Sequence, residues 1–399
     1  MFKKKGYSIS NYKFSIISIV IVFTVISSIL IQRLQDSDEN QFQKQVFGIL
    51  LGIFIMVVVS LVDYHFICKM YIPLYLLNIL LMFICKYVPY SKFPLIYGWQ
   101  HYQAKRWIKI GGHGQPGQGF EFMPSELSKI ILIIVLAKVL VLLNKRLNTF
   151  WGLMIALVVG CIPIYLVFSQ PDLSTSIVLI VTFIIMLFLG GLSYKVVLPA
   201  LAIGIPLMFG LFWYVQQDYQ GLLDEYQQKR ILSILHPEEY SDLMYQQNNA
   251  AAAISSGGMF GKMIVGSEER RLTDFVPVVE SDFIFSAIAE ELGFFGCVFI
   301  IFLFLLFVFL CFQIARRARD RLGYLLASGI AVMLAVQALV NIGVVLSLLP
   351  NTGIPLPFMS SGLSSLMTNM ATVGILLNIG MQNKDIVIDE KYEFEEGVL

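Results

Sequence analysis

Apolar residues occur along this chain in about ten long runs, which shorter polar and charged stretches separate. A helix needs ~20 apolar residues to cross the hydrocarbon core of a bilayer, so these runs predict membrane-spanning helices. The predicted helices cover residues 12–31, 46–66, 70–88, 127–143, 149–168, 174–191, 194–215, 284–313, 323–347 and 362–381. An even number of spans predicts that both termini lie on the same side of the membrane.

Lysine and arginine residues are unevenly distributed over the connections between these helices. The short connections 33–45, 169–173 and 348–361 hold only Arg33 and Lys44 between them. Because short cytoplasmic loops are enriched in Lys and Arg, the bias predicts cytoplasmic N- and C-termini. The basic residues on the predicted cytoplasmic side are Lys3, Lys4, Lys5, Lys13, Lys69, Lys145, Arg146, Lys195, Arg316, Arg317, Arg319 and Arg321.

The composition supports a membrane protein. Of the 399 residues, 57% are hydrophobic and only 14% are charged, with a mean hydropathy of +0.76, whereas an average soluble domain has about 25% charged residues. The 28 Lys and Arg residues balance 27 Asp and Glu residues, so no basic excess exists to neutralise nucleic-acid phosphates. We therefore expect an all-α integral membrane protein, a single polytopic domain over residues 1–399, with membrane lipids and no nucleic acid as partners.

Two long connections fall on the predicted outer face, at about residues 89–126 and 216–281. Long connections in compact proteins are usually functional or disordered. These two are rich in aromatic and aliphatic residues, which favours order and function. The acidic segment at about 382–399 is predicted to be a solvated cytoplasmic tail.

Asp282 is the strongest candidate for chemistry. It ends the second long connection and precedes the apolar run at 284–313, which is longer than a bilayer requires. A carboxylate that is partly dehydrated at the mouth of a helix bundle can have a raised pKa and act as a general base. The alternative is that Asp282 caps its helix by accepting a backbone hydrogen bond.

Glu290 and Glu291 follow Asp282 on the same predicted helix. At ~100° per residue, Glu290 lies ~80° around the helix from Asp282 and Glu291 lies ~180° from it. Glu290 can therefore share a cavity with Asp282. A buried carboxylate paired with Arg or Lys is the alternative for either glutamate.

Several basic residues could hold an anionic group near the outer surface. Glu126 and Lys129 are three residues apart and share a helix face, so a local ion pair is one interpretation. In the other, Arg106 and Lys129, together with Lys229 and Arg230 of the second long connection, bind a diphosphate.

Asp172 lies in a tight outer turn after Gln170 and Pro171. It either caps the following helix or contributes to the outer site. The four histidines have no metal-ligand spacing, so the sequence requires no cofactor, although a divalent cation that bridges a diphosphate stays compatible with it.

Six motifs in this chain resemble the SEDS family (shape, elongation, division and sporulation), whose members include RodA, FtsW and SpoVE. The match runs from about Arg106 to Gly380. In order, the motifs are RWI…PSELSK, QPDLSTS, QQKRILSILHPEEY, AISSGGMFGK, SDFIFSAIAEELGFFG and PNTGIPLPFMSSG. Their order on one face of a ten-span protein makes the resemblance specific.

The resemblance implies a peptidoglycan glycosyltransferase that polymerises lipid II at the outer face of the bacterial cytoplasmic membrane. By analogy with the family, Asp282 is the essential carboxylate that deprotonates the 4-hydroxyl of the acceptor sugar. Arg106, Glu126 and Lys129 match the other charged positions that matter in the family. The resemblance also implies a class B penicillin-binding protein as the transpeptidase partner.

The chain departs from the usual family pattern at several positions beside these motifs. Val278 and Glu280 replace a Glu and a His in the segment before Asp282. The sequence Ser361-Gly362-Leu363 replaces a Tyr-Gly-Gly, and Asn249-Ala250 replaces a Gln-Ser. These changes indicate a divergent member of the family.

Two alternatives to the polymerase belong to other functional classes. A lipid II flippase would need polar groups that continue to the cytoplasmic side, and Lys138 is the main residue that points deeper. A catalytically silent scaffold for a penicillin-binding protein would account for the altered motif residues. A polymerisation assay on the wild-type protein and an Asp282 variant distinguishes the three.

Overall fold

The computed structural model describes residues 12–34, 39–88, 96–101, 104–111, 120–217, 219–223, 225–266, 270–351 and 353–382. Lys3, Lys4 and Lys5, the acidic tail after Gln382 and part of the connection at 89–126 lie outside these residues. Their predicted roles stay predictions.

All ten predicted spans are helical in the structure. Asp63 separates the second predicted span into α2 and α3, because its side chain accepts a hydrogen bond from the His65 N–H and caps a new helix. The helices are α1 (Phe14–Leu34), α2 (Glu39–Leu61), α3 (Tyr64–Lys69), α4 (Tyr71–Tyr87), α5 (Pro124–Leu143), α6 (Phe150–Phe168), α7 (Leu173–Leu189), α8 (Tyr194–Val215), α12 (Ile284–Arg317), α13 (Arg321–Val345) and α14 (Leu363–Met381).

Seven of the described helices are long and apolar enough to cross a membrane, and α4 and α7 are shorter apolar helices. The apolar helix α5 differs because it carries Glu126, Lys129 and Lys138. α13 and α14 are buried along most of their length, and α14 packs beside α2 while α13 packs beside α12, α7 and α5. The core therefore lies around α5, α13 and α14.

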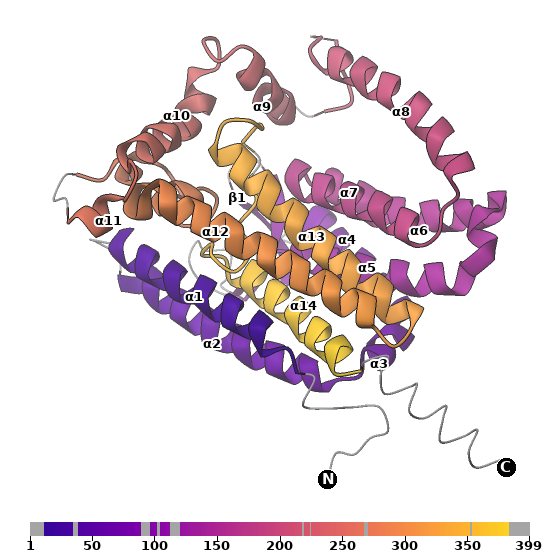
Figure 1. The fold of residues 1–399 in the computed structure, drawn as a ribbon. Coiled ribbons are helices and arrows are strands. Elements are labelled where there is room, and N and C mark those ends of the chain that lie inside the picture. The colour runs from indigo at the N-terminus through magenta and orange to yellow at the C-terminus, as the bar shows by residue number, and fades with distance from the viewer. Residues whose placement is uncertain are drawn as a thin grey trace.

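Helix α8 is the exception to this packing. Residues 198–213 are all exposed, and Figure 1 shows α8 standing apart from the other long helices. A helix that is apolar all round is stable only where apolar material surrounds it, which a lipid bilayer supplies.

The two described ends of the chain lie at the same end of the bundle. Figure 1 shows that α1 begins and α14 ends there, away from α10 and α11. The Tyr12 hydroxyl lies 3.4 Å from the Ser60 hydroxyl at that end. The number of helices that cross the membrane stays a prediction.

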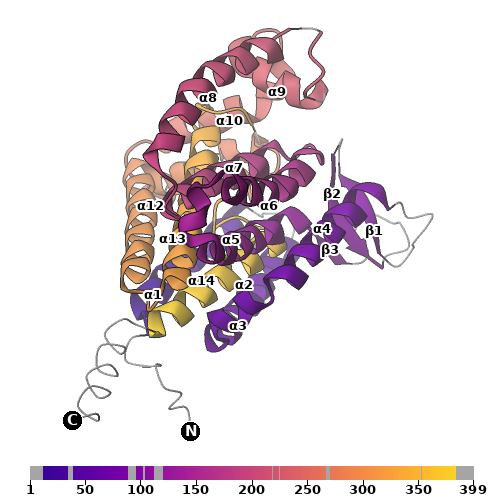
Figure 2. The ribbon, with the colours of Figure 1, turned by 90° about the vertical axis from the view of Figure 1, so that its right-hand side faces the viewer.

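The long connections are ordered, as expected, but their secondary structure was not foreseen. Residues 216–281 contain α9 (Glu225–Leu235), α10 (Ser241–Ser256), α11 (Lys262–Val265) and the 3₁₀ helix η4 (Leu272–Phe275). The first connection forms an antiparallel sheet in the order β1-β2-β3, beside the end of α4 (Figure 2), where the Gly98 N–H donates to the Val88 carbonyl at 2.8 Å. Its strands are β1 (Ile96–His101), β2 (Ala104–Ile110) and β3 (Phe120–Phe122).

Helix α12 is divided at Gly293, whose φ of 69° and ψ of −168° are not helical. A residue with a Cβ would meet the Gly261 nitrogen at 2.4 Å, so this position suits glycine. The freed N–H groups of Phe294 and Phe295 donate to the carbonyls of Gly258 and Met259, at 2.9 Å and 3.2 Å. The break therefore separates the first turns after Asp282 from the long apolar part of the helix.

Candidate functional site

Asp282 lies at the end of the bundle where α12 begins, in a turn that starts at Val278. The N–H groups of Ser281 and Asp282 donate to the Val278 carbonyl at 3.2 Å and 3.3 Å. Val278 itself has a φ of +57°, a strained conformation for a β-branched residue. The side chain of Asp282 does not cap α12, whose N-cap is Phe283 without a side-chain hydrogen bond.

The Asp282 carboxyl is partly buried and crowded. The Ser281 hydroxyl donates to its Oδ1 atom at 2.8 Å. Gly353 lies over the other oxygen, and a Cβ at that position would stand 3.1 Å from Oδ2. Gly353 has a φ of +73°, so the close approach and the backbone conformation both favour glycine.

Burial raises the pKa of Asp282 above its ordinary value. The Ser281 hydrogen bond and the positive charges of Arg230 and Arg106 lower the same pKa, and the charge of Glu280 raises it. The net effect is upward. A carboxylate with a raised pKa is a better proton acceptor than an ordinary aspartate, while the neighbouring arginines keep an ionised form available.

Arg106 and Arg230 act on Asp282 through their charges, from separate segments of the chain. Arg230, on α9, donates to the Asn351 carbonyl at 2.8 Å. Arg106, on β2, donates through Nη2 to the Pro171 carbonyl, and its buried Nε has no hydrogen-bond partner among the described residues. The site therefore places two guanidinium groups within electrostatic range of one carboxylate.

Lys229 is not brought to this cluster. Its side chain is 48% exposed and forms an ion pair with Glu225, one turn earlier on α9, at 2.5 Å. Its neighbour Arg230 projects from the helix ~100° away, which explains why only one of the two basic residues faces Asp282.

Glu126 and Lys129 form a buried ion pair at the start of α5. The Lys129 ammonium lies 2.9 Å from Glu126 Oε2 and donates to Gln337 Oε1 at 2.9 Å. Gln337 in turn donates to the Pro355 carbonyl at 3.0 Å. The pair therefore connects α5 to α13 and to the segment that holds Gly353.

Asp172 is the N-cap of α7. It accepts from the Thr175 N–H at 3.2 Å and from the Ser125 hydroxyl at 2.9 Å, so it also joins the start of α7 to the start of α5. This geometry matches the capping alternative. A contact between Asp172 and a substrate stays a prediction.

Glu290 faces the α10–η4 segment and does not meet Asp282. Its carboxylate accepts from Lys262 at 2.7 Å, from the Ser256 hydroxyl at 3.0 Å and from two backbone N–H groups. Those N–H groups belong to Leu272 and Thr273. The alternative of a structural carboxylate paired with a basic residue is the geometry observed.

Glu291 is likewise a buried carboxylate paired with basic residues, the alternative that the sequence offered for either glutamate. It lies 3.2 Å from Arg33 at the end of α1 and 2.5 Å from Arg271 beside η4. Together, the two adjacent glutamates fasten the 216–281 connection and α1 to the first turns of α12.

Two uncharged polar residues of α13 were not predicted as part of the site, and Asn341 is the one that contacts Asp282. Gln337 and Asn341 lie one turn apart in the mostly apolar α13, and both are buried. Polar residues on one face of a spanning helix indicate a functional site. The spacing of four residues puts both side chains on the same helix face.

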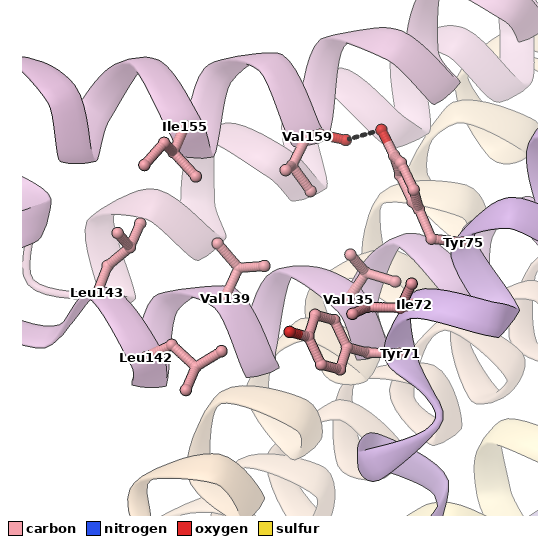
Figure 3. A pocket seen from close by; sticks show the side chains of 9 residues that line it. All are labelled: Tyr71, Ile72, Tyr75, Val135, Val139, Leu142, Leu143, Ile155 and Val159. Carbon is pink, nitrogen blue, oxygen red and sulfur yellow. Dashed lines mark hydrogen bonds between the residues drawn. The ribbon is translucent and has the colours of Figure 1, made fainter.

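An apolar pocket of about 350 Å³ lies elsewhere, between α4, α5 and α6 (Figure 3). None of the predicted site residues lines it, and we assign it no chemistry. Among the described residues, no group of three or more His, Cys, Asp or Glu side chains is placed to hold a metal ion.

Known proteins resemble this chain over most of its length. Sequences 31% identical to it include a probable peptidoglycan glycosyltransferase FtsW from Geobacter sp. (strain M18), over 90% of this chain and 92% of the relative. The peptidoglycan glycosyltransferase MrdB of Escherichia coli (strain K12) is 31% identical over 92% of each chain.

Solved structures share the fold. One, described as "Structural coordination of polymerization and crosslinking by a peptidoglycan synthase complex", matches with a TM-score of 0.75 and 24% identity over 92% of this chain and 97% of that chain. The crystal structure of the rod shape determining protein RodA of Thermus thermophilus matches with a TM-score of 0.64 and 24% identity, over 92% and 96%.

A family model described as "Cell cycle protein" matches residues 9–385, nearly the whole chain. The motifs around Asp282, the helical architecture and the two sets of relatives all agree with this match. The chain belongs to the FtsW, RodA and SpoVE family of cell cycle proteins.

Proposed function

We propose that this protein is a peptidoglycan glycosyltransferase that polymerises lipid II, a disaccharide-pentapeptide carried on undecaprenyl diphosphate. The relatives named as peptidoglycan glycosyltransferases support this activity. One structural observation carries the assignment of the site. Asp282 is a partly buried carboxylate with a raised pKa, within electrostatic range of the guanidinium groups of Arg106 and Arg230.

In the proposed reaction, Asp282 accepts the proton of the 4-hydroxyl of the acceptor sugar. The resulting oxygen nucleophile attacks the anomeric carbon of the donor sugar and forms the new glycosidic bond. The bond from that carbon to undecaprenyl diphosphate breaks, and its electron pair leaves with the diphosphate. The donor carries its own activated leaving group, so the proposal includes no nucleotide or resident cofactor.

Arg106 and Arg230 have a role on the leaving-group side. Negative charge accumulates on the diphosphate as its bond to the sugar breaks, and guanidinium groups stabilise such charge by bidentate hydrogen bonds. The buried, unpartnered Nε of Arg106 supports this role, because a phosphate oxygen would satisfy it.

We further propose that the Asp282 end of the bundle faces outward. At the opposite end, Arg321 donates to Asn144 at 2.6 Å and to the Gly190 carbonyl at 2.6 Å, which brings three connections together. These connections carry Lys145, Arg146, Lys195, Arg316, Arg317, Arg319 and Arg321. Basic connections favour the cytoplasmic side.

A class B penicillin-binding protein is the proposed partner, which would crosslink the glycan strands that this chain makes. The similar solved structure comes from a complex described as coordinating polymerization and crosslinking, and it supports this part of the proposal. Copurification of the chain with a transpeptidase of its own organism tests it.

A lipid II polymerisation assay on purified protein, with and without the transpeptidase, tests the proposed function. Asp282→Asn keeps the shape of the side chain but cannot accept the proton, so we expect a loss of about 10²–10⁴-fold, the range for a general base. Asp242→Asn, an exposed aspartate on α10, is the matched control and should behave as the wild type. Unchanged polymer from Asp282→Asn would overturn the assignment of the base.

The same samples separate the other two classes of function. A flippase would move fluorescent lipid II across a vesicle membrane without making polymer. A scaffold would bind the transpeptidase equally well as wild type and as Asp282→Asn, and neither protein would make polymer. Either result would contradict the proposal that this protein is a polymerase.

A further inference from the structure

The backbone beside Asp282 is held by an unusual series of hydrogen bonds. The carbonyls of three successive residues, Glu280, Ser281 and Asp282, each accept one from outside the turn. The Ser361 N–H donates to Glu280 at 2.8 Å, and the Ser360 hydroxyl donates to Ser281. Asn341 donates to the Asp282 carbonyl at 2.8 Å. The turn is therefore tied to α13 and to the segment at 353–362.

Asn341 is the member of this series that touches Asp282 itself. Asn341 is 1% exposed and lies near the end of α13. The same Nδ2 atom donates to the Ile354 carbonyl at 2.7 Å. Both N–H groups of the amide are thus used, one on each of the two segments that enclose the Asp282 carboxyl.

The position of Gly353 connects the Asn341 hydrogen bonds to the placement of the Asp282 carboxyl. Gly353 precedes Ile354 and lies over the Asp282 carboxyl, so Asn341 sets the distance between the carboxyl and the backbone above it. The Oδ1 atom of Asn341 is buried and has no hydrogen-bond partner among the described residues. Burying an amide oxygen without a hydrogen bond costs free energy. The structural return for that cost is the pair of hydrogen bonds from the Asn341 nitrogen.

We propose that Asn341 is a positioning residue for the glycosyl transfer, which holds the Asp282 carboxylate against the acceptor hydroxyl by fixing its backbone to the segment at Gly353 and Ile354. This inference rests on the proposed function. Asn341 acts through Asp282 and touches no reacting atom. Rates depend steeply on such placement, since a shift of ~1 Å can cost about 10²-fold.

Asn369, on α14, supplies a matched control. It is also a buried asparagine in a spanning helix, and its Oδ1 also has no partner among the described residues. Its Nδ2 donates to Ser365, within its own helix, at 3.3 Å. Replacing Asn369 therefore removes a similar buried amide without releasing the Asp282 turn.

The test compares Asn341→Leu with Asn369→Leu in the lipid II polymerisation assay, with kcat, KM and the pH profile measured on folded protein. For Asn341→Leu we expect kcat to fall about 10–100-fold with KM changed less than about threefold. The released carboxyl gains water, so the acidic limb of its pH profile should move to lower pH. Asn369→Leu should keep the wild-type kcat and pH profile.

A purely structural role would lower the amount of folded protein and leave both readouts unchanged. If folded Asn341→Leu has the kcat and pH profile of Asn369→Leu, the inference is overturned. Asn341→Asp keeps the shape but puts an oxygen in place of the nitrogen that donates to both carbonyls, and it replaces the leucine variant if that variant does not fold. It should lose at least as much kcat, and a wild-type kcat would overturn the inference equally.

Asp282→Asn in the same assay distinguishes a failure of the proposed base from a failure of the positioning role of Asn341. If Asp282→Asn polymerises lipid II as the wild type does, the proposed base is wrong whatever Asn341 does. If Asp282→Asn is inactive and Asn341→Leu is normal, only the positioning role fails.

Discussion

The hydroxyl of Tyr75 donates to the backbone carbonyl of Val159 at 3.0 Å (Figure 3). In an undisturbed helix this carbonyl would accept from residue 163, but that residue is a proline and has no N–H. Tyr75, on α4, therefore satisfies the one group that Pro163 leaves unpaired inside α6. Hydrocarbon cannot donate a hydrogen bond to this carbonyl, whereas water could at a solvent-exposed surface. We therefore expect the Tyr75 bond to contribute more to stability in the membrane.

Replacing Tyr75 by Phe tests this bond. We expect the free energy of unfolding in detergent to fall by about 1–3 kcal/mol, the cost of an unsatisfied buried carbonyl. Tyr71→Phe is the control, because Tyr71 lines the same pocket and the described part of the chain shows no hydrogen bond from its hydroxyl. Equal unfolding midpoints for the two variants would contradict the role of Tyr75.

The pH dependence of polymerisation tests the electrostatics of Asp282. The base must be ionised, so the rate falls as the pH falls through its pKa, and burial places that pKa above the ordinary value. Arg230 lowers this pKa, so removing its charge in Arg230→Gln raises the pKa further and shifts the acidic limb to higher pH. Arg106→Gln should shift the limb in the same direction.

Lys229→Gln is the matched control for this shift, since Lys229 lies on the same helix and pairs with Glu225. It removes the same formal charge and should leave the acidic limb in place. A limb that moves equally in the Lys229 and Arg230 variants would show a general charge effect and not a local one.

The buried pair of Glu126 and Lys129 predicts a strong difference between single and double variants. Lys129→Met leaves the Glu126 charge buried without its partner, which costs about 3–5 kcal/mol of unfolding free energy. Adding Glu126→Gln removes that charge and should restore much of the loss. Unfolding measurements on the three proteins check this. A double variant no more stable than Lys129→Met would contradict the pairing.

The strained turn at Val278 predicts a stabilising substitution. Glycine adopts a positive φ without the Cβ clash, and the strain of a residue such as Val278 is about 1–3 kcal/mol. Val278 is 40% exposed, so little burial is lost in Val278→Gly, and we expect a net gain of about 1 kcal/mol after the greater chain entropy of glycine. Val276→Gly, at a buried residue with a φ of −94°, should instead destabilise.

The helices of the bundle could be predicted closely, whereas those of the long connections could not. Each spanning segment must satisfy its own backbone hydrogen bonds in hydrocarbon, so a long apolar run has essentially one conformation available to it. Helices such as α9 and α10 are polar and partly exposed, so no apolar run marks them. The break of α12 at Gly293 was also missed, because it depends on the backbone of Gly258 and Met259 from the preceding connection.

Sequence by itself determined the long apolar helices of the bundle, because the hydropathy of a segment reports whether water or hydrocarbon surrounds it. It also singled out Asp282 as a candidate, whereas the number of spans that cross the membrane stays a prediction. Only the tertiary structure decided which residues meet. It hydrogen-bonded Asn341 to Asp282 and placed Arg106 and Arg230 within electrostatic range of it. It also turned Glu290 and Lys229 toward other partners. Such contacts join segments that are far apart in the chain, and their geometry is set by how the helices pack.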